Sequence, residues 1–282
     1  MLMMPKRSVA ITALYAAVFM THPCSADSPL WIGGWGVWGT TDETSGQYIR
    51  VPVLQAFVAE GADSTVLPKE YRTLAGRMLH FYDSDGNAGS ARVERVDDPD
   101  GGGCLPGILV PEPLPVSLEK FFLASTAPIQ IAPSDEIARA DPRLSAGISH
   151  YLRNSGVIAP QIEIVRAQAA DLDGDGKMEA VVEAITQGRN IGEMGENQPG
   201  DFSIVAIGSL TGSSYVVAGH VGYISNGERT PSRFGIVALP DFTGSGRFDL
   251  AISYYGWEWA GIDVYAWKDG SLRLLASAYC GV

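Results

Sequence analysis

The sequence predicts a mainly β protein whose antiparallel strands form propeller-blade-like units, with one helix near residues 142–154. Short apolar and β-branched runs alternate with glycine- and aspartate-rich turns, which is typical of strands. A succession of strand, acidic loop and strand occurs twice, 70 residues apart, which indicates an internal repeat. Helix signals are confined to a single segment.

The N-terminus has the layout of a secretory signal peptide over residues 1–26. Lys6 and Arg7 precede a 12-residue apolar run, which is too short to span a membrane. We therefore expect an exported mature protein, periplasmic or extracellular, without a transmembrane segment. Removing this segment leaves 18 basic and 32 acidic residues, a formal charge of −14, which argues against nucleic acid as a partner.

Two cysteines, Cys104 and Cys280, remain after signal removal. An oxidising compartment favours a disulfide between them, which would stabilise the fold by up to about 5 kcal/mol. Two buried free thiols are the alternative.

The sequence divides into a β-rich N-terminal region, residues 27–135, and a region of a helix plus repeats, residues 136–282. In the first region, residues 48–58 read as a strand, and residues 78–82 and 91–96 read as a hairpin around an Asp- and Gly-containing turn.

The helix is predicted from its ends and its apolar spacing. Asp141 can cap it, Pro142 suits its first turn, and Gly156 offers a left-handed stop. Leu144, Ile148, Tyr151 and Leu152 fall on one face. Only strands are predicted after it, at residues 162–169, 179–186, 202–208, 214–221, 234–239, 251–255, 262–267 and 272–278.

An acidic loop follows the first of these strands and predicts a calcium site. Its candidate ligands, at loop positions 1, 3, 5, 7 and 9, are Asp171, Asp173, Asp175, the Lys177 carbonyl and Glu179. Gathering these carboxylates is unfavourable unless a hard cation lies among them. An EF-hand is excluded because position 12, which requires a bidentate Glu, is Val182.

A second loop repeats the first in register with fewer charges. It consists of Asp241, Thr243, Ser245, Arg247 and Asp249 at the corresponding positions. Neutral oxygens replace two carboxylates and Arg247 adds a positive charge, so a turn held by hydrogen bonds is favoured over a weak second metal loop.

The first loop resembles the calcium loop of FG-GAP and VCBS repeats, the blade motif of integrin-alpha-like β-propellers. The resemblance covers residues 162–187 closely and 234–256 loosely. It implies antiparallel strands around the loop and calcium bound by acids at positions 1, 3, 5 and 9 and a carbonyl at position 7. The order of these features is also similar to that of small exported bacterial proteins of unassigned activity.

The sequence contains no recognisable catalytic constellation. Tyr255, Trp257 and Trp259 could stack on a sugar ring or peptide, although buried core is the plainer interpretation. The leading hypothesis is an exported, non-enzymatic binding or interaction module with structural calcium and an unknown protein or glycan ligand. The alternatives are a secreted hydrolase acting on glycan or peptide through an aromatic-lined groove, and a scaffolding protein.

Overall fold

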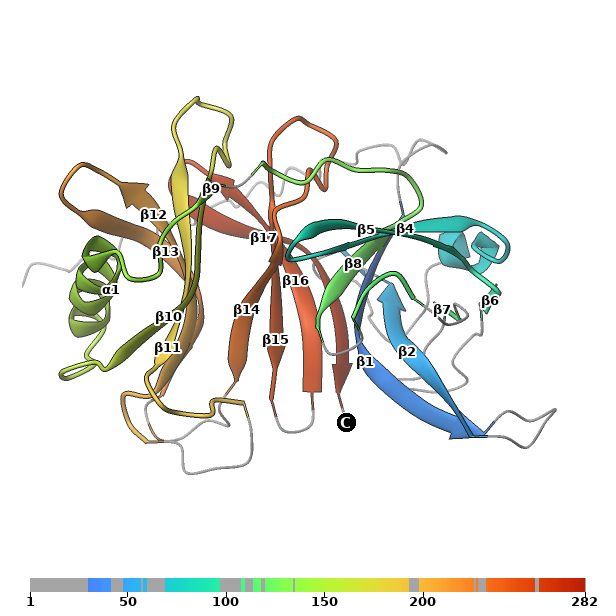
Figure 1. Cartoon of the computed structure of the whole chain (residues 1–282), viewed down its shortest axis with the longest axis horizontal. Helices are drawn as coiled ribbons and strands as arrows, with labels where there is room; N and C mark the ends of the chain where they lie inside the picture. The colour runs from blue at the N-terminus through green and yellow to red at the C-terminus, as the bar shows by residue number, and fades with distance from the viewer. Residues whose placement is uncertain are drawn as a thin grey trace, which may run out of the picture.

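A computed structural model shows a mainly β protein, whose described residues form three five-stranded antiparallel sheets and one α-helix (Figure 1). The mainly β class, the antiparallel strands and the helix are as predicted, whereas the arrangement in three sheets was not predicted. It describes residues 30–41, 48–56, 58–59, 69–96, 108–109, 114–117, 120–133, 135–192, 198–225, 227, 232–256 and 259–281. The predicted signal peptide, Cys104, the Cys280 side chain and Trp257 lie outside the described residues. Within the ranges described, no helix has the length and apolar character needed to cross a membrane.

The helix-backed sheet contains the first predicted strand pair. Its strands are antiparallel in the order β13-β12-β11-β10-β9. Their bounds are β9 (Asp135–Glu136), β10 (Ile162–Ala170), β11 (Glu179–Thr186), β12 (Phe202–Leu210) and β13 (Tyr215–Ile224). The predicted strands after the helix are thus confirmed here, each within three residues at either end.

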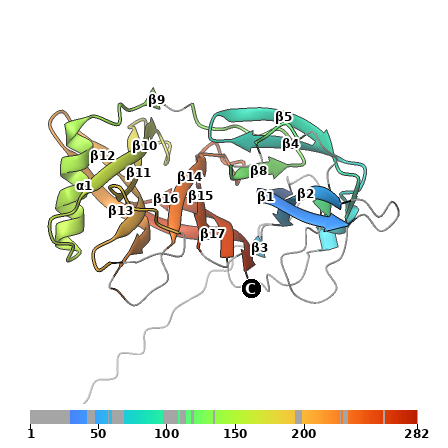
Figure 2. The same cartoon turned by 60° about the horizontal axis from the view of Figure 1, so that its bottom comes forward.

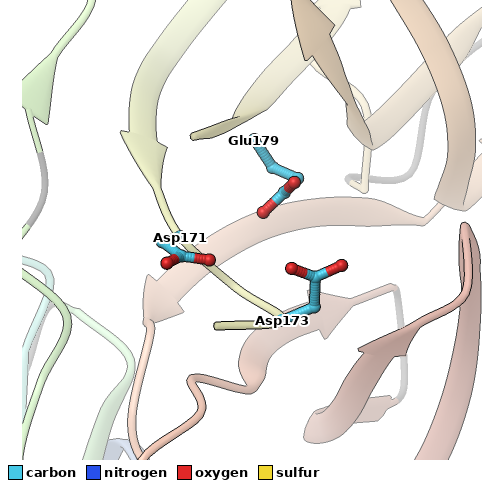
Figure 3. A group of neighbouring side chains, drawn as sticks. All are labelled: Asp171, Asp173 and Glu179. Carbon is cyan, nitrogen blue, oxygen red and sulfur yellow. The ribbon is translucent and has the colours of Figure 1, made fainter. Parts of the chain in front are cut away.

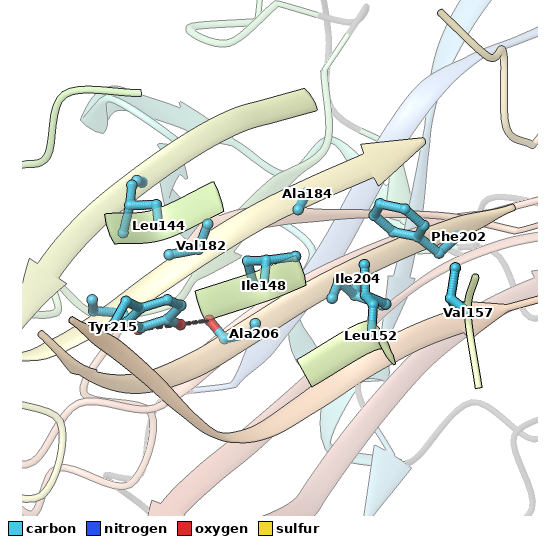
Figure 4. Close-up of a cluster of buried hydrophobic side chains, with 12 residues drawn as sticks. Leu144, Ile148, Leu152, Val157, Val182, Ala184, Phe202, Ile204, Ala206 and Tyr215 are labelled. Carbon is cyan, nitrogen blue, oxygen red and sulfur yellow. Dashed lines mark hydrogen bonds between the residues drawn. The ribbon is translucent and has the colours of Figure 1, made fainter. Parts of the chain in front are cut away.

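Helix α1 (Pro142–Asn154) covers one face of this sheet and matches the predicted range (Figure 1). Asp141 caps it, because its Oδ1 accepts a 2.9 Å hydrogen bond from the Arg143 N–H. Leu144, Ile148 and Leu152 are fully buried against Val182, Phe202 and Ile204, among others (Figure 4). The apolar face read from the sequence therefore forms the contact with the sheet.

The C-terminal sheet repeats the meander of the helix-backed sheet. Its order is β14-β15-β16-β17-β3, antiparallel throughout. The bounds are β14 (Arg233–Ala238), β15 (Leu250–Tyr255), β16 (Trp259–Lys268), β17 (Ser271–Gly281) and β3 (Val58–Ala59). Strands β10–β13 and β14–β17 are each four consecutive neighbours, as two copies of one unit would be.

The N-terminal sheet has the order β2-β1-β8-β4-β5, and β4 matches the first strand of the predicted hairpin. The second strand was predicted at residues 91–96, but its partner β5 covers residues 86–92, because the turn closes already at Gly86, and residues 95–96 pair with β7 instead. The remaining elements are short. The bounds are β1 (Trp31–Thr41), β2 (Tyr48–Ala56), β4 (Met78–Asp83), β5 (Gly86–Arg92), β8 (Phe122–Ser125), the 3₁₀ helix η1 (Lys69–Thr73), and the pair β6 (Arg95–Val96) and β7 (Ile108–Leu109).

The three sheets follow one another along the molecule, with the C-terminal sheet in the middle (Figures 1 and 2). Val181 and Val205 pack on Ile252 between the helix-backed and C-terminal sheets. Tyr82 and Leu123 join the N-terminal sheet to the opposite face of the C-terminal sheet, where Val237 and Ala251 lie. The described strands form no closed propeller. Because β3 pairs with β17, the predicted ranges 27–135 and 136–282 share a sheet.

Candidate functional sites

The two acidic loops occupy the same place in their sheets. The first joins β10 to β11 and the second joins β14 to β15. Each needs left-handed backbone at two glycines, with φ of 75° and 83° at Gly174 and Gly176 and 69° and 77° at Gly244 and Gly246. A Cβ at Gly174 would lie 3.7 Å from Arg247 Cγ, so the loops are neighbours.

Backbone donors hold the first carboxylate of the first loop. Asp171 Oδ1 accepts from the N–H groups of Gly174 and Asp175 at 2.8 and 3.1 Å, and its Oδ2 accepts from Gly176 at 2.9 Å. Glu179 Oε2 accepts from the Leu172 N–H at 2.9 Å. The loop is therefore folded around its own acids, and position 9 is tied back to position 2.

Three of the four predicted carboxylates converge (Figure 3). Asp171, Asp173 and Glu179 each present an oxygen, and these oxygens lie within 4.8 Å of one another. All three side chains are partly exposed. Calcium–oxygen distances are about 2.3–2.6 Å, so oxygens on opposite sides of one ion are about 5 Å apart. The spacing of the three oxygens fits a single calcium shell.

The fourth carboxylate, Asp175, has a different partner. Its Oδ2 lies 2.7 Å from Lys177 Nζ, and its Oδ1 accepts from the Lys177 N–H at 2.8 Å. The Lys177 ammonium holds the pKa of Asp175 below its usual value. The structure thus directs Asp175 to the side chain of Lys177, whereas the sequence predicts it as a ligand.

The electrostatics of the cluster suit a cation. Burial raises the pKa of Glu179, the Leu172 N–H opposes this shift, and the carboxylates of Asp173 and Asp171 add to it. A divalent ion would reverse the sign of the local field and restore the ionised form.

The second loop reproduces these hydrogen bonds with fewer acids. Asp241 accepts from Ser245 and Gly246 at 2.9 and 2.8 Å, and Asp249 Oδ2 accepts from Phe242 at 3.2 Å. The hydroxyl of Thr243 donates to Ser245 Oγ at 2.9 Å. Burial raises the pKa of Asp249 to about 7. These hydrogen bonds fit the turn that the sequence favours for this loop, and the alternative of a weak metal site stays untested.

The structure separates the aromatic residues predicted to share one stacking surface. Trp259 lines a pocket of about 590 Å³ together with Tyr254 and Asp263, whereas Tyr255 lines a different cleft. Successive residues of a strand point to opposite faces, so Tyr254 and Tyr255 diverge. Trp257 lies outside the described residues, so its place beside Trp259 stays a prediction.

A charged cleft at the junction of the three sheets was not predicted. Its volume is about 910 Å³, and Glu183, Arg166, Gln168 and Arg233 line it. Glu183 Oε1 lies 3.0 Å from Arg233 Nη2, with Glu183 only 7% exposed. Burial raises the pKa of Glu183, and Arg233 opposes the shift.

The sequence does contain a signal for this cleft. Glu183 interrupts an otherwise apolar strand and alternates with Val181 and Ile185, so it occupies the face that packs on the C-terminal sheet. An acid in that register needs a buried partner. That requirement predicts a basic residue opposite it, although not which one.

Comparison with known proteins finds no matching family model, no matching curated protein and no matching solved structure.

Proposed function

We propose that this chain is an exported, non-enzymatic binding module stabilised by a calcium ion in the loop of residues 171–179. The ion is structural: it fixes the turn between β10 and β11, which lies beside the second loop. Asp171, Asp173 and Glu179 are the side-chain ligands. The ligand of the module is a protein or a glycan in the periplasm or outside the cell.

The convergence of three carboxylate oxygens within 4.8 Å carries this proposal. Like charges at that separation repel one another, and a bound cation would remove this repulsion. A partly exposed site of this kind binds calcium weakly, which is sufficient outside the cell, where calcium is plentiful. Dissociation constants of about 10⁻⁴ to 10⁻³ M are typical of extracellular modules.

The repeated architecture supports the proposal independently of the charges. Both loops join the first two strands of a four-stranded meander and make the same hydrogen bonds at positions 1, 2, 5, 6 and 9. This arrangement is what the resemblance to FG-GAP and VCBS repeats implies. We infer that the two meanders are blade-like units and that the second has lost its ion.

The pocket beside Trp259 does not support the hydrolase alternative. Glycoside hydrolysis usually requires two carboxyl groups flanking the scissile bond. In the pocket beside Trp259, the lining described contains one carboxylate, Asp263, which accepts hydrogen bonds from Tyr265 at 3.0 Å and Ser277 at 2.7 Å. That arrangement holds the carboxylate in place and provides no second acid.

A thermal melt tests the calcium proposal. The protein is heated with chelator and with about 10 mM calcium, where binding at the expected affinity would stabilise it by about 1–3 kcal/mol. We expect a higher melting temperature with calcium for the wild type and no shift for Asp173→Ala. Asp269→Asn, which changes an acid in the β16–β17 turn, should shift as the wild type does. Equal shifts in Asp173→Ala and the wild type would place the ion elsewhere.

A further inference from the structure

We propose that the cleft where the three sheets meet binds a small organic anion, a carboxylate or phosphate ester with a planar apolar part, and that Arg166 and Gln168 hold its anionic group. This inference specifies the ligand of the proposed binding module. It rests on that function for its context, but none of its contacts involves the calcium loop.

The cleft has the size and the position of a ligand site. Its volume of about 910 Å³ falls within the range of about 300–1,000 Å³ usual for small-molecule pockets. Its walls come from the β4–β5 turn, from β10 and β11, and from β14 and β15. Sites of this kind are common where separate layers of a fold meet.

Arg166 lies at the centre of this junction. It sits on β10, and its guanidinium donates to the Ser84 carbonyl of the N-terminal sheet at 2.5 Å and to the Ile236 carbonyl of the C-terminal sheet at 3.4 Å. A register shift next to Arg166 in β10 sets its direction. One side chain therefore contacts all three sheets and is held rigidly beside the cavity.

Arg166 forms no direct ion pair with any residue that the structure describes. Among the described residues, no carboxylate lies within 4.0 Å of it, and its two hydrogen bonds use two of its five N–H donors. Glu183, on the paired strand β11, interacts electrostatically with Arg166 but forms its ion pair with Arg233, at 3.0 Å. The charged side chains that line the cleft sum to +1, although the whole chain has a formal charge of −12; they are Asp85, Lys120, Glu136, Arg139, Arg166, Glu183 and Arg233. An anion in the cleft would neutralise this excess.

Gln168 supplies the second, independent observation. It is 4% exposed and lines the cleft, yet its side-chain amide makes no hydrogen bond to any residue that the structure describes. A buried amide without a partner is destabilising by about 1–3 kcal/mol. Such groups in native proteins generally face a water molecule or a ligand. Gln168 and Arg166 are two apart on β10, so their side chains point to the same face.

An aromatic pair at the rim indicates the rest of the ligand. Phe121 and Tyr255 line the cleft and stack on each other with ring centroids 6.2 Å apart and planes 21° apart. A flat apolar group can extend this stack while its anionic end reaches Arg166. An inorganic ion would leave the aromatic rim unused.

Calorimetric titration tests the inference with three probes: sodium benzoate, inorganic phosphate and the neutral analogue benzamide, at matched ionic strength in sodium chloride. We expect benzoate to bind more tightly than benzamide, which lacks the negative charge. We also expect phosphate to bind more weakly than benzoate, because it has the charge but no apolar part to contact the aromatic pair. Arg166→Gln should weaken benzoate binding about 10- to 100-fold, the loss expected for charge-assisted hydrogen bonds. Arg273→Gln, exposed on β17 outside the cleft, should bind within about twofold of the wild type.

A second variant guards against misfolding of the first. Gln168→Leu should also weaken benzoate binding, while the ligand-free protein melts at the same or a higher temperature because an unpaired amide has been removed. A purely structural Gln168 would show the opposite change in stability. No binding of benzoate or phosphate, or equal binding by Arg166→Gln and the wild type, would overturn the inference.

Calcium must be varied separately in the same titrations. Benzoate binding in chelator that is unchanged by calcium would support the cleft even if the 171–179 loop binds no ion. If the protein responds to calcium but binds neither benzoate nor phosphate, the calcium proposal stands and the inference of an anion site is wrong.

Discussion

Replacing Gly147 by alanine should destabilise the protein, although alanine is the better helix former. Gly147 lies in the middle of α1, where Gly→Ala normally gains about 1 kcal/mol. Here the added Cβ would lie 3.0 Å from the carbonyl carbon and the Cβ of Tyr215, and closer still to its carbonyl oxygen. Ordinary contacts of this kind are 3.4–4 Å, so α1 and β13 would have to move apart.

The structure gives the size of this effect. Moving α1 away loosens the contacts of Leu144 and Ile148, both fully buried. Overpacking of this kind costs about 1–3 kcal/mol, occasionally more. With the propensity gain subtracted from the upper part of that range, we expect a net loss of about 2 kcal/mol. For a chain of this size, that corresponds to a melting temperature lower by about 4–8 °C.

Urea unfolding followed by circular dichroism measures this loss. Gly212→Ala is the matched control, because its Cβ would meet nothing within 4 Å. The control should stay within about 0.5 kcal/mol of the wild type. If Gly147→Ala were as stable as the wild type, the close approach of α1 to β13, and the packing built on it, would be refuted.

Two further predictions concern buried charges. Burial raises the pKa of Asp249 to about 7 in the folded protein, so the folded state binds a proton there more tightly than the unfolded state does. The free energy of unfolding of the wild type should therefore fall, relative to that of Asp249→Asn, as the pH rises from about 4 to 7. The difference should be absent below that window and reach at most about 4 kcal/mol above it; unfolding curves with the same pH dependence for both proteins would contradict this. Arg233→Met leaves Glu183 buried without its ion pair and should cost about 3–5 kcal/mol, whereas Arg233→Met with Glu183→Met should recover most of the loss. Equal unfolding free energies for the single and double variants would show that the pair is not coupled.

Local signals in the sequence were sufficient for most of the C-terminal fold. The Asp141 cap, Pro142 and the apolar spacing predict α1, because each acts within one or two helical turns. The strands of both meanders follow from their short apolar runs. Sheet order does not: β3 pairs with β17 across more than 200 positions, and nothing local in Val58 or Ala59 specifies that partner.

For the candidate sites, too, the sequence predicts only those residues that a local turn brings together. Asp171, Asp173 and Glu179 were predictable because one tight turn brings them together. The ion pair between Asp175 and Lys177 was not, because it depends on side-chain conformations that the spacing does not specify. Arg166 and Gln168 depend on three sheets meeting. In the sequence they alternate with apolar residues along β10, which is also the pattern of a strand with one face exposed to solvent.

Calcium stoichiometry tests the central claim most directly. Equilibrium dialysis of the purified protein should find one ion bound per chain at millimolar calcium, and none for Asp173→Ala at the same concentration. A wild-type chain that binds no calcium, or an Asp173→Ala chain that still binds one ion, would contradict the account.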